Sequence, residues 1–110
     1  MSIDSKQEKA ATAKLRANRR AAVREQELGH LTAEQIATGT RGLSVAAYAK
    51  AYSAGANPRD ESDLDDRLDR YLARGVKTDA HEQAFLDGNT YRDELPEAHL
   101  RERIENPSQH

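Results

Sequence analysis

The chain of 110 residues contains no cysteine and no tryptophan. The absence of cysteine excludes disulfides, thiolate metal sites, iron–sulfur clusters and a cysteine nucleophile. Because small secreted domains usually need disulfides, we expect a cytoplasmic location. Aromatic residues make up only 5% of the chain. This scarcity predicts a thin hydrophobic core and a protein that depends on a partner for part of its stability.

Long hydrophobic runs are missing as well. No stretch approaches the ~18 consecutive apolar residues of a transmembrane helix. The first residues of the chain lack the apolar region of a signal peptide. We therefore expect no membrane partner.

The sequence also lacks recognisable catalytic and metal-binding motifs. It contains no phosphate-binding glycine loop and no nucleophile elbow. The segment His81-Glu82-Gln83-Ala84-Phe85 begins like the zinc motif His-Glu-x-x-His but has no second histidine. The histidines show no ligand spacing and are all expected at the surface: His30, His81, His99 and His110. The sequence therefore predicts a protein that is not an enzyme, with no catalytic residues, no cofactor and no metal site.

Charged residues, in contrast, are abundant, with 17 lysines and arginines against 19 aspartates and glutamates. The two halves of the chain differ in sign. Residues 1–50 carry a formal net charge of +4, and residues 51–110 carry −6. The sequence therefore predicts a basic arm followed by an acidic body.

The apolar pattern predicts an all-α fold, a single small domain of five or six short helices, because no segment alternates as a strand does. Ser5 with Glu8 has the spacing of a capping box and predicts a long basic helix from there to about Leu28. That helix lacks a continuous apolar stripe, so we expect it to pack weakly and to be mobile. The expected regions are 1–28 as this helix, 29–106 as a compact helical domain and 107–110 as a loose tail.

Further signals divide the helical domain. Thr32 with Gln35 forms a second capping box. The predicted helix starts are Thr32, Ser44, Thr78 and Pro96. The predicted helix ends are Gly39, Gly55, Gly75, Gly88 and Asn106-Pro107. The strongest amphipathic stripe of the chain, at helical spacing, consists of Leu64, Leu68, Tyr71 and Leu72.

The densest run of charge lies just before and within this stripe. Its members are Asp60, Glu61, Asp63, Asp65, Asp66 and Asp69. Acidic residues at a helix start complement the helix dipole, and several of these can pair with arginines four residues on, so the run has a purely structural interpretation. The functional interpretation is an acidic face that docks on the basic surface of a protein partner. Tyrosines would contribute contacts there, with Tyr71 as the main candidate and Tyr48 and Tyr52 as either contacts or core.

Our leading hypothesis is therefore a non-catalytic helical interaction protein that acts as an inhibitor or as an accessory, regulatory factor. Its composition is typical of phage- and plasmid-encoded proteins with antitoxin-like or anti-defence roles. Self-association as a homodimer is left open.

The alternative is a DNA-binding regulator with a helix-turn-helix over residues 32–55. Its phosphate and base contacts would come from Arg16, Arg19, Arg20, Arg24, Arg41, Ser44 and Lys50. The second helix of that unit offers one lysine and no arginine, asparagine or glutamine to read base edges. An outward face formed by Ser44, Ala47, Lys50 and Ala51 would favour this alternative.

Two short patches carry a resemblance to a known family. Tyr52-Ser53-Ala54-Gly55 and Ala84-Phe85-Leu86-Asp87-Gly88 resemble the aromatic-x-x-Gly helix ends of ribosome modulation factor and of small phage proteins similar to it. The chain departs from that family in lacking its basic composition and its Cys-Pro-Tyr stretch. No function follows from the resemblance.

Overall fold

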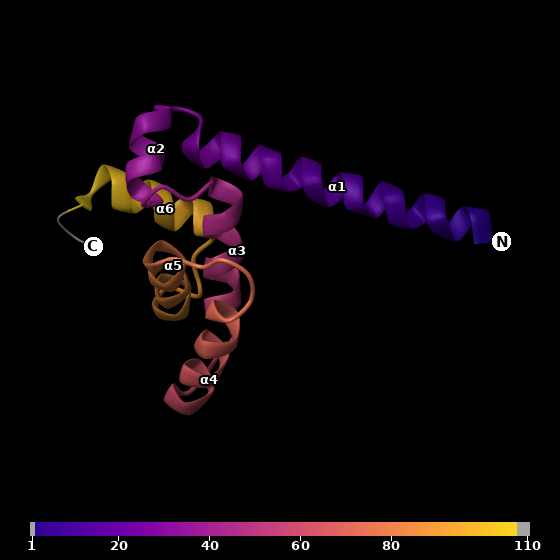
Figure 1. Cartoon of the computed structure of the whole chain (residues 1–110). Coiled ribbons are helices and arrows are strands. Elements are labelled where there is room, and N and C mark those ends of the chain that lie inside the picture. Colours follow the sequence, from indigo (N-terminus) through magenta and orange to yellow (C-terminus); the bar gives the residue numbers. More distant parts are fainter. Residues whose placement is uncertain (1, 108–110) are drawn as a thin grey trace. The chain divides into compact units, whose positions relative to one another are not determined.

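The computed structural model describes residues 2–107, with side chains from residue 9 onward (Figure 1). Over this range all regular structure is helical, which confirms the predicted fold class. The helices are α1 (Ser2–Leu28), α2 (Ala33–Gly39), α3 (Val45–Gly55), α4 (Glu61–Leu72), α5 (Asp79–Thr90) and α6 (Pro96–Glu105). The chain divides into two units, Met1–His30 with α1 and Leu31–His110 with the other helices. No helix among the described residues is both long enough and apolar enough to span a membrane.

The first unit is one long helix. It begins at Ser2, so the predicted start at Ser5 is wrong: the residues before Ser5 continue the helix instead of ending it. The side chains of the predicted Ser5–Glu8 capping box lie outside the described ones. The end is as predicted, because Gly29 follows the last helical residue and its N–H donates to the Glu25 carbonyl at 2.9 Å.

Capping side chains begin α2 and α3 in the second unit. The predicted Thr32–Gln35 capping box is present at α2: the Thr32 N–H donates to Gln35 Oε1 at 2.9 Å, and the Gln35 N–H donates to Thr32 Oγ1 at 3.1 Å. At α3 the Ser44 hydroxyl accepts from the Ala47 N–H at 3.0 Å, as predicted. Each bond satisfies one of the backbone donors that a helix start leaves free.

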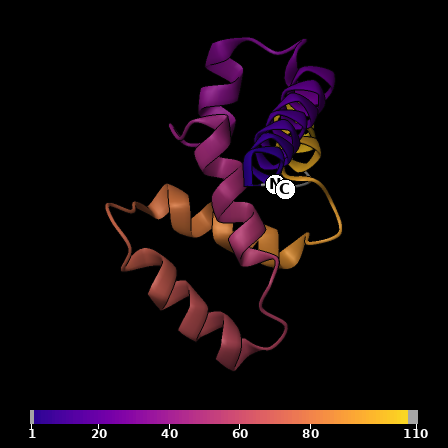
Figure 2. The same ribbon diagram turned by 90° about the vertical axis from the view of Figure 1, so that its right-hand side faces the viewer.

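The core lies where α3 crosses α5 (Figure 2). Tyr48 and Tyr52 from α3 and Phe85 from α5 are 1% exposed. The two helices touch through glycine. A Cβ at Gly55 would stand 1.8 Å from the Phe85 carbonyl oxygen, and one at Gly88 would stand 1.9 Å from the Tyr52 carbonyl oxygen. Each glycine therefore accommodates the backbone of the aromatic residue on the opposite helix.

This crossing corrects the interpretation of Gly88 as a helix end. α5 continues through Gly88 to Thr90, and Gly88 is buried inside the helix. The glycine is needed for close approach to α3, which no local signal reveals. Gly75 also differs: α4 ends at Leu72, and Gly75 lies in the following turn with φ +69°.

Hydrogen bonds between distant segments hold this core to its surroundings. The Tyr52 hydroxyl donates to the Tyr91 carbonyl, 39 residues away. Asn89 Nδ2 donates to the carbonyls of Gly55 at 3.0 Å and Pro58 at 2.9 Å, which joins the end of α3 to α5. α6 begins with Pro96 in its first turn and ends before Asn106-Pro107, both as predicted, and its Leu100 is fully buried.

The helix with the strongest amphipathic pattern is the one least buried. No residue of α4 is fully buried, and Leu64, Leu68, Tyr71 and Leu72 are all half-buried. Within the second unit, α4 packs mainly against α5 and α3 (Figure 2). The apolar stripe of α4 is therefore only partly covered by its own chain.

Candidate functional site

The six acidic residues of the predicted docking face do not form one surface, because half of them bond within α4. Asp60 is the N-cap, and its Oδ1 accepts from the Asp63 N–H at 2.8 Å. Asp63 pairs with Arg67 at 3.0 Å, and Asp66 pairs with Arg70 at 2.8 Å, each four residues apart on the helix. The structural interpretation of the run therefore holds for Asp60, Asp63 and Asp66.

The other three acids form a row. Glu61, Asp65 and Asp69 are spaced by four residues, so they share one side of α4. All three are exposed, and no ion pair joins them to another residue in the described part of the chain. The row borders the half-buried side chains of Leu68 and Leu72. It is the part of the acidic run that remains available to a partner.

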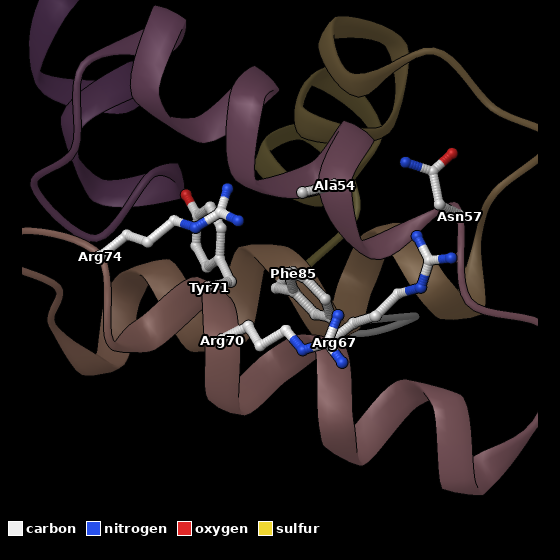
Figure 3. A pocket seen from close by; sticks show the side chains of 7 residues that line it. All are labelled: Ala54, Asn57, Arg67, Arg70, Tyr71, Arg74 and Phe85. Atoms are coloured by element: carbon white, nitrogen blue, oxygen red, sulfur yellow. The ribbon is translucent and has the colours of Figure 1, made fainter.

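The opposite side of α4 is basic, which the sequence interpretation missed. Arg67, Arg70 and Arg74 line a cavity of about 300 Å³ together with Ala54, Asn57, Tyr71 and Phe85. Figure 3 shows Phe85 between Tyr71 with Arg74 on one side and Arg67 with Asn57 on the other. The three- and four-residue spacing of the arginines was the signal that could have revealed it.

Tyr71 forms a wall of this cavity and also belongs to the packing of α4. Its ring lies 5.4 Å from the ring of Phe85, and Lys77 Nζ lies 5.0 Å from the centre of the Tyr71 ring. Burial raises the pKa of the Tyr71 hydroxyl above its ordinary value. Tyr48 and Tyr52 are core residues, so their interpretation as partner contacts is wrong.

The residues of the DNA-binding alternative lie in both units. On α1, Arg16, Arg19, Arg20 and Arg24 are exposed. In the second unit, Arg41 is in the turn before α3, 3.9 Å from Asp87, and Lys50 is exposed on α3. The Ser44 hydroxyl caps α3, and Ala51 is fully buried. The outward face of Ser44, Ala47, Lys50 and Ala51 that this alternative needs is therefore not formed.

A second cluster of charged groups surrounds His99, which corrects the expectation that this histidine is at the surface. The residue is 0% exposed. Its Nδ1 lies 3.1 Å from Glu94 Oε2, and its Nε2 lies 4.0 Å from Asp87 Oδ2. The rings of Tyr91 and Tyr52 lie 4.4 Å and 5.5 Å from the imidazole. Because α6 begins at Pro96, His99 lies on the buried side of that helix. A surface position was expected for His99 only because the histidines show no ligand spacing.

Arg103 also belongs to the cluster around His99, through Asp87. Arg103 Nη1 donates to Asp87 Oδ2 at 3.3 Å and to the Gly39 carbonyl at 3.2 Å, which links α6 to α5 and α2. Burial raises the pKa of Tyr48 to about 12, with Arg103 partly offsetting the effect. Burial and the carboxylate of Glu94 raise the pKa of Tyr52 above its ordinary value.

The other histidines have different roles or lie elsewhere. His81 Nδ1 accepts from the Thr78 N–H at 3.1 Å and so helps to begin α5. His30 is exposed. His110 lies outside the described residues, as does most of the tail 107–110.

Comparisons of the chain with protein-family models, with curated proteins and with solved structures found no match.

Proposed function

We propose that this chain binds a protein partner that has a basic surface, and that it does so through α4. The observation that carries the proposal is the row of Glu61, Asp65 and Asp69, exposed and without an ion pair in the described part of the chain. By occupying the surface of that partner, the chain acts as an inhibitor or accessory factor, the kind of role that small proteins of phages and plasmids have. It requires no catalytic group and no cofactor.

Two properties of α4 support this proposal. The half-buried stripe of Leu64, Leu68 and Leu72 offers apolar area that a partner can cover, and such area supplies most of the free energy of association. The acidic row beside it supplies long-range attraction and orientation. Apolar contact with charge at its edge is the usual composition of a protein–protein interface.

The internal ion pairs of α4 have little part in this function. Exposed pairs four residues apart contribute about 0.3–0.5 kcal/mol to stability, and their charges are already neutralised locally. We therefore assign partner binding to Glu61, Asp65 and Asp69, with Tyr71 and the apolar stripe, and assign Asp60, Asp63 and Asp66 to the stability of the helix.

The experiment is affinity capture from the native cell with mass spectrometry, performed with and without nuclease and at low and high salt. The test variant is Glu61→Gln/Asp65→Asn/Asp69→Asn. The control variant, Glu34→Gln/Asp79→Asn/Asp93→Asn, makes the same change in charge at exposed positions on other elements.

We expect one protein partner that survives nuclease, is retained by the control variant and is lost or much weakened in the test variant and at high salt. Retention of that partner by the test variant would contradict the proposal. Capture that depends on nucleic acid would instead favour the DNA-binding alternative.

A further inference from the structure

We infer that Glu94, His99 and Glu102 form a binding site for a divalent transition-metal ion of the zinc type. One oxygen or nitrogen atom from each of the three residues lies within 4.8 Å of the corresponding atoms of the other two. His99 and Glu102 are three residues apart on α6, so they project from the same side of the helix. Glu94 comes from the turn before Pro96. The ion would therefore join that turn to α6.

The burial of the three residues differs in a way that suits a metal site. The His99 side chain is 1% exposed, the Glu94 side chain is 35% exposed, and Glu102 is half-buried. Stacking of the Tyr91 ring on the imidazole at 4.4 Å fixes the orientation of His99. A rigid nitrogen ligand is thus paired with two carboxylates that can rotate toward an ion arriving from solvent.

Carboxylates also flank His99, and the one at Nε2, Asp87, is already paired with Arg103 at 3.3 Å, which leaves Glu94 as the carboxylate available at Nδ1. A metal ion bound by Nδ1, Glu94 and Glu102 leaves Nε2 on the side of Asp87, 4.0 Å from its Oδ2. A histidine ligand whose second nitrogen faces a carboxylate is a common arrangement in metal sites.

The ligand set selects the kind of metal. Imidazole nitrogen suits zinc, nickel and copper, whereas magnesium and calcium prefer sites made only of oxygen. Zinc bonds to nitrogen and oxygen are about 2.0–2.2 Å long. Ligands with bonds of that length lie roughly 3.3 Å apart around a tetrahedral ion. His99 Nδ1 and Glu94 Oε2 already have this spacing at 3.1 Å, so any closing movement falls to the Glu102 side chain. Water would complete the coordination, since three protein ligands leave a position open.

The test uses the full chain without an affinity tag and measures binding of ZnCl₂ and of MgCl₂ by calorimetry. The test variants are Glu94→Gln and Glu102→Gln. The control is Glu105→Gln, the same change on the same helix at a glutamate that pairs with Arg101 at 3.2 Å. Circular dichroism establishes that each variant is folded, and the shift in Tm on adding ZnCl₂ gives a second readout.

We expect one Zn²⁺ per chain, no comparable Mg²⁺ binding, and a rise in Tm with Zn²⁺. Each test variant should bind Zn²⁺ about tenfold more weakly or worse, because even residues behind the ligands have effects of that size. The control should bind as the unaltered chain does.

Three results would overturn the inference. They are the absence of Zn²⁺ binding, equal affinity in the test and control variants, and equal binding of Mg²⁺. The first of these would show that the three residues serve only the packing and hydrogen bonding around His99.

Discussion

The α3–α5 crossing and α4 contrast in two properties: the strength of the amphipathic pattern in their sequences and the degree to which their side chains are buried. α3 and α5 have weak amphipathic patterns, yet their aromatic side chains are 1% exposed and their backbones touch at Gly55 and Gly88. α4 has the clearest apolar stripe of the chain, yet none of its residues is fully buried.

The difference shows that periodicity alone does not determine which helix forms the core. An amphipathic stripe indicates which side of a helix is buried away from water, but not how closely another helix can approach that side. Small residues at a crossing decide how closely two helices can approach, and close approach allows Tyr48, Tyr52 and Phe85 to be fully enclosed. A strong stripe that remains half-exposed is then free for contact with another molecule.

The largest effect is expected at the crossing itself. Gly88→Ala places a Cβ against the Tyr52 carbonyl oxygen, so the helices must separate, at a cost of about 3 kcal/mol or more. Gly42→Ala is the control: its Cβ meets nothing within 4 Å, and only its φ of +89° costs energy, roughly 1 kcal/mol. Urea denaturation measures both. Equal losses in the two variants would show that backbone contact does not limit the crossing.

The next comparison is between two apolar side chains. Phe85→Ala empties an enclosed position and should cost about 3–5 kcal/mol. Leu68→Ala removes a half-buried side chain from α4 and should cost about 1–2 kcal/mol. Chemical denaturation of the isolated chain gives both values. A loss at Leu68 as large as that at Phe85 would mean that α4 belongs to the core, and it would remove the apolar part of the proposed interface.

The third comparison depends on pH and tests the enclosure of α3. In the unfolded chain Tyr48 loses its proton near its ordinary pKa of 10.0, whereas the folded protein retains it up to about pH 12. Its contribution to stability is therefore complete below pH 10 and is lost as the pH rises through 12, roughly 2–3 kcal/mol in all. We expect Tyr48→Phe to weaken the decline of stability between pH 10 and 12, as measured by urea denaturation at each pH. If the decline of stability between pH 10 and 12 is unchanged in Tyr48→Phe, other tyrosines are its cause.

Local signals predicted the helices well. The Thr32–Gln35 capping box, the Ser44 cap, Pro96 at the start of α6 and the stop after Leu28 depend on residues within a few positions of one another. Such interactions form whenever the segment is helical, whatever surrounds it. The start of α1 is an exception, because the helix extends past the predicted cap at Ser5 to Ser2.

The candidate site was predicted only in part, because its properties depend on which side chains meet. The sequence located the acidic run, the four-residue spacing of the Asp63–Arg67 and Asp66–Arg70 pairs, and Tyr71. The cavity that Tyr71 lines together with the arginines depended on how α4 meets α3 and α5. No ligand spacing marks His99 in the sequence, and the Glu94–His99–Glu102 cluster becomes evident only because the fold buries His99 beside two tyrosine rings.

The amino-acid sequence by itself determined that the chain is helical, where most helices begin and end, and which segment has the densest charge. Each of these follows from bonds and side-chain directions within one or two helical turns. Only the tertiary structure decided that Gly88 serves a crossing, that Tyr48, Tyr52 and His99 are enclosed, and that α4 keeps its stripe half-exposed. Those outcomes depend on contacts between residues such as Gly55 and Phe85, 30 positions apart, and no local pattern encodes a contact at that distance along the chain.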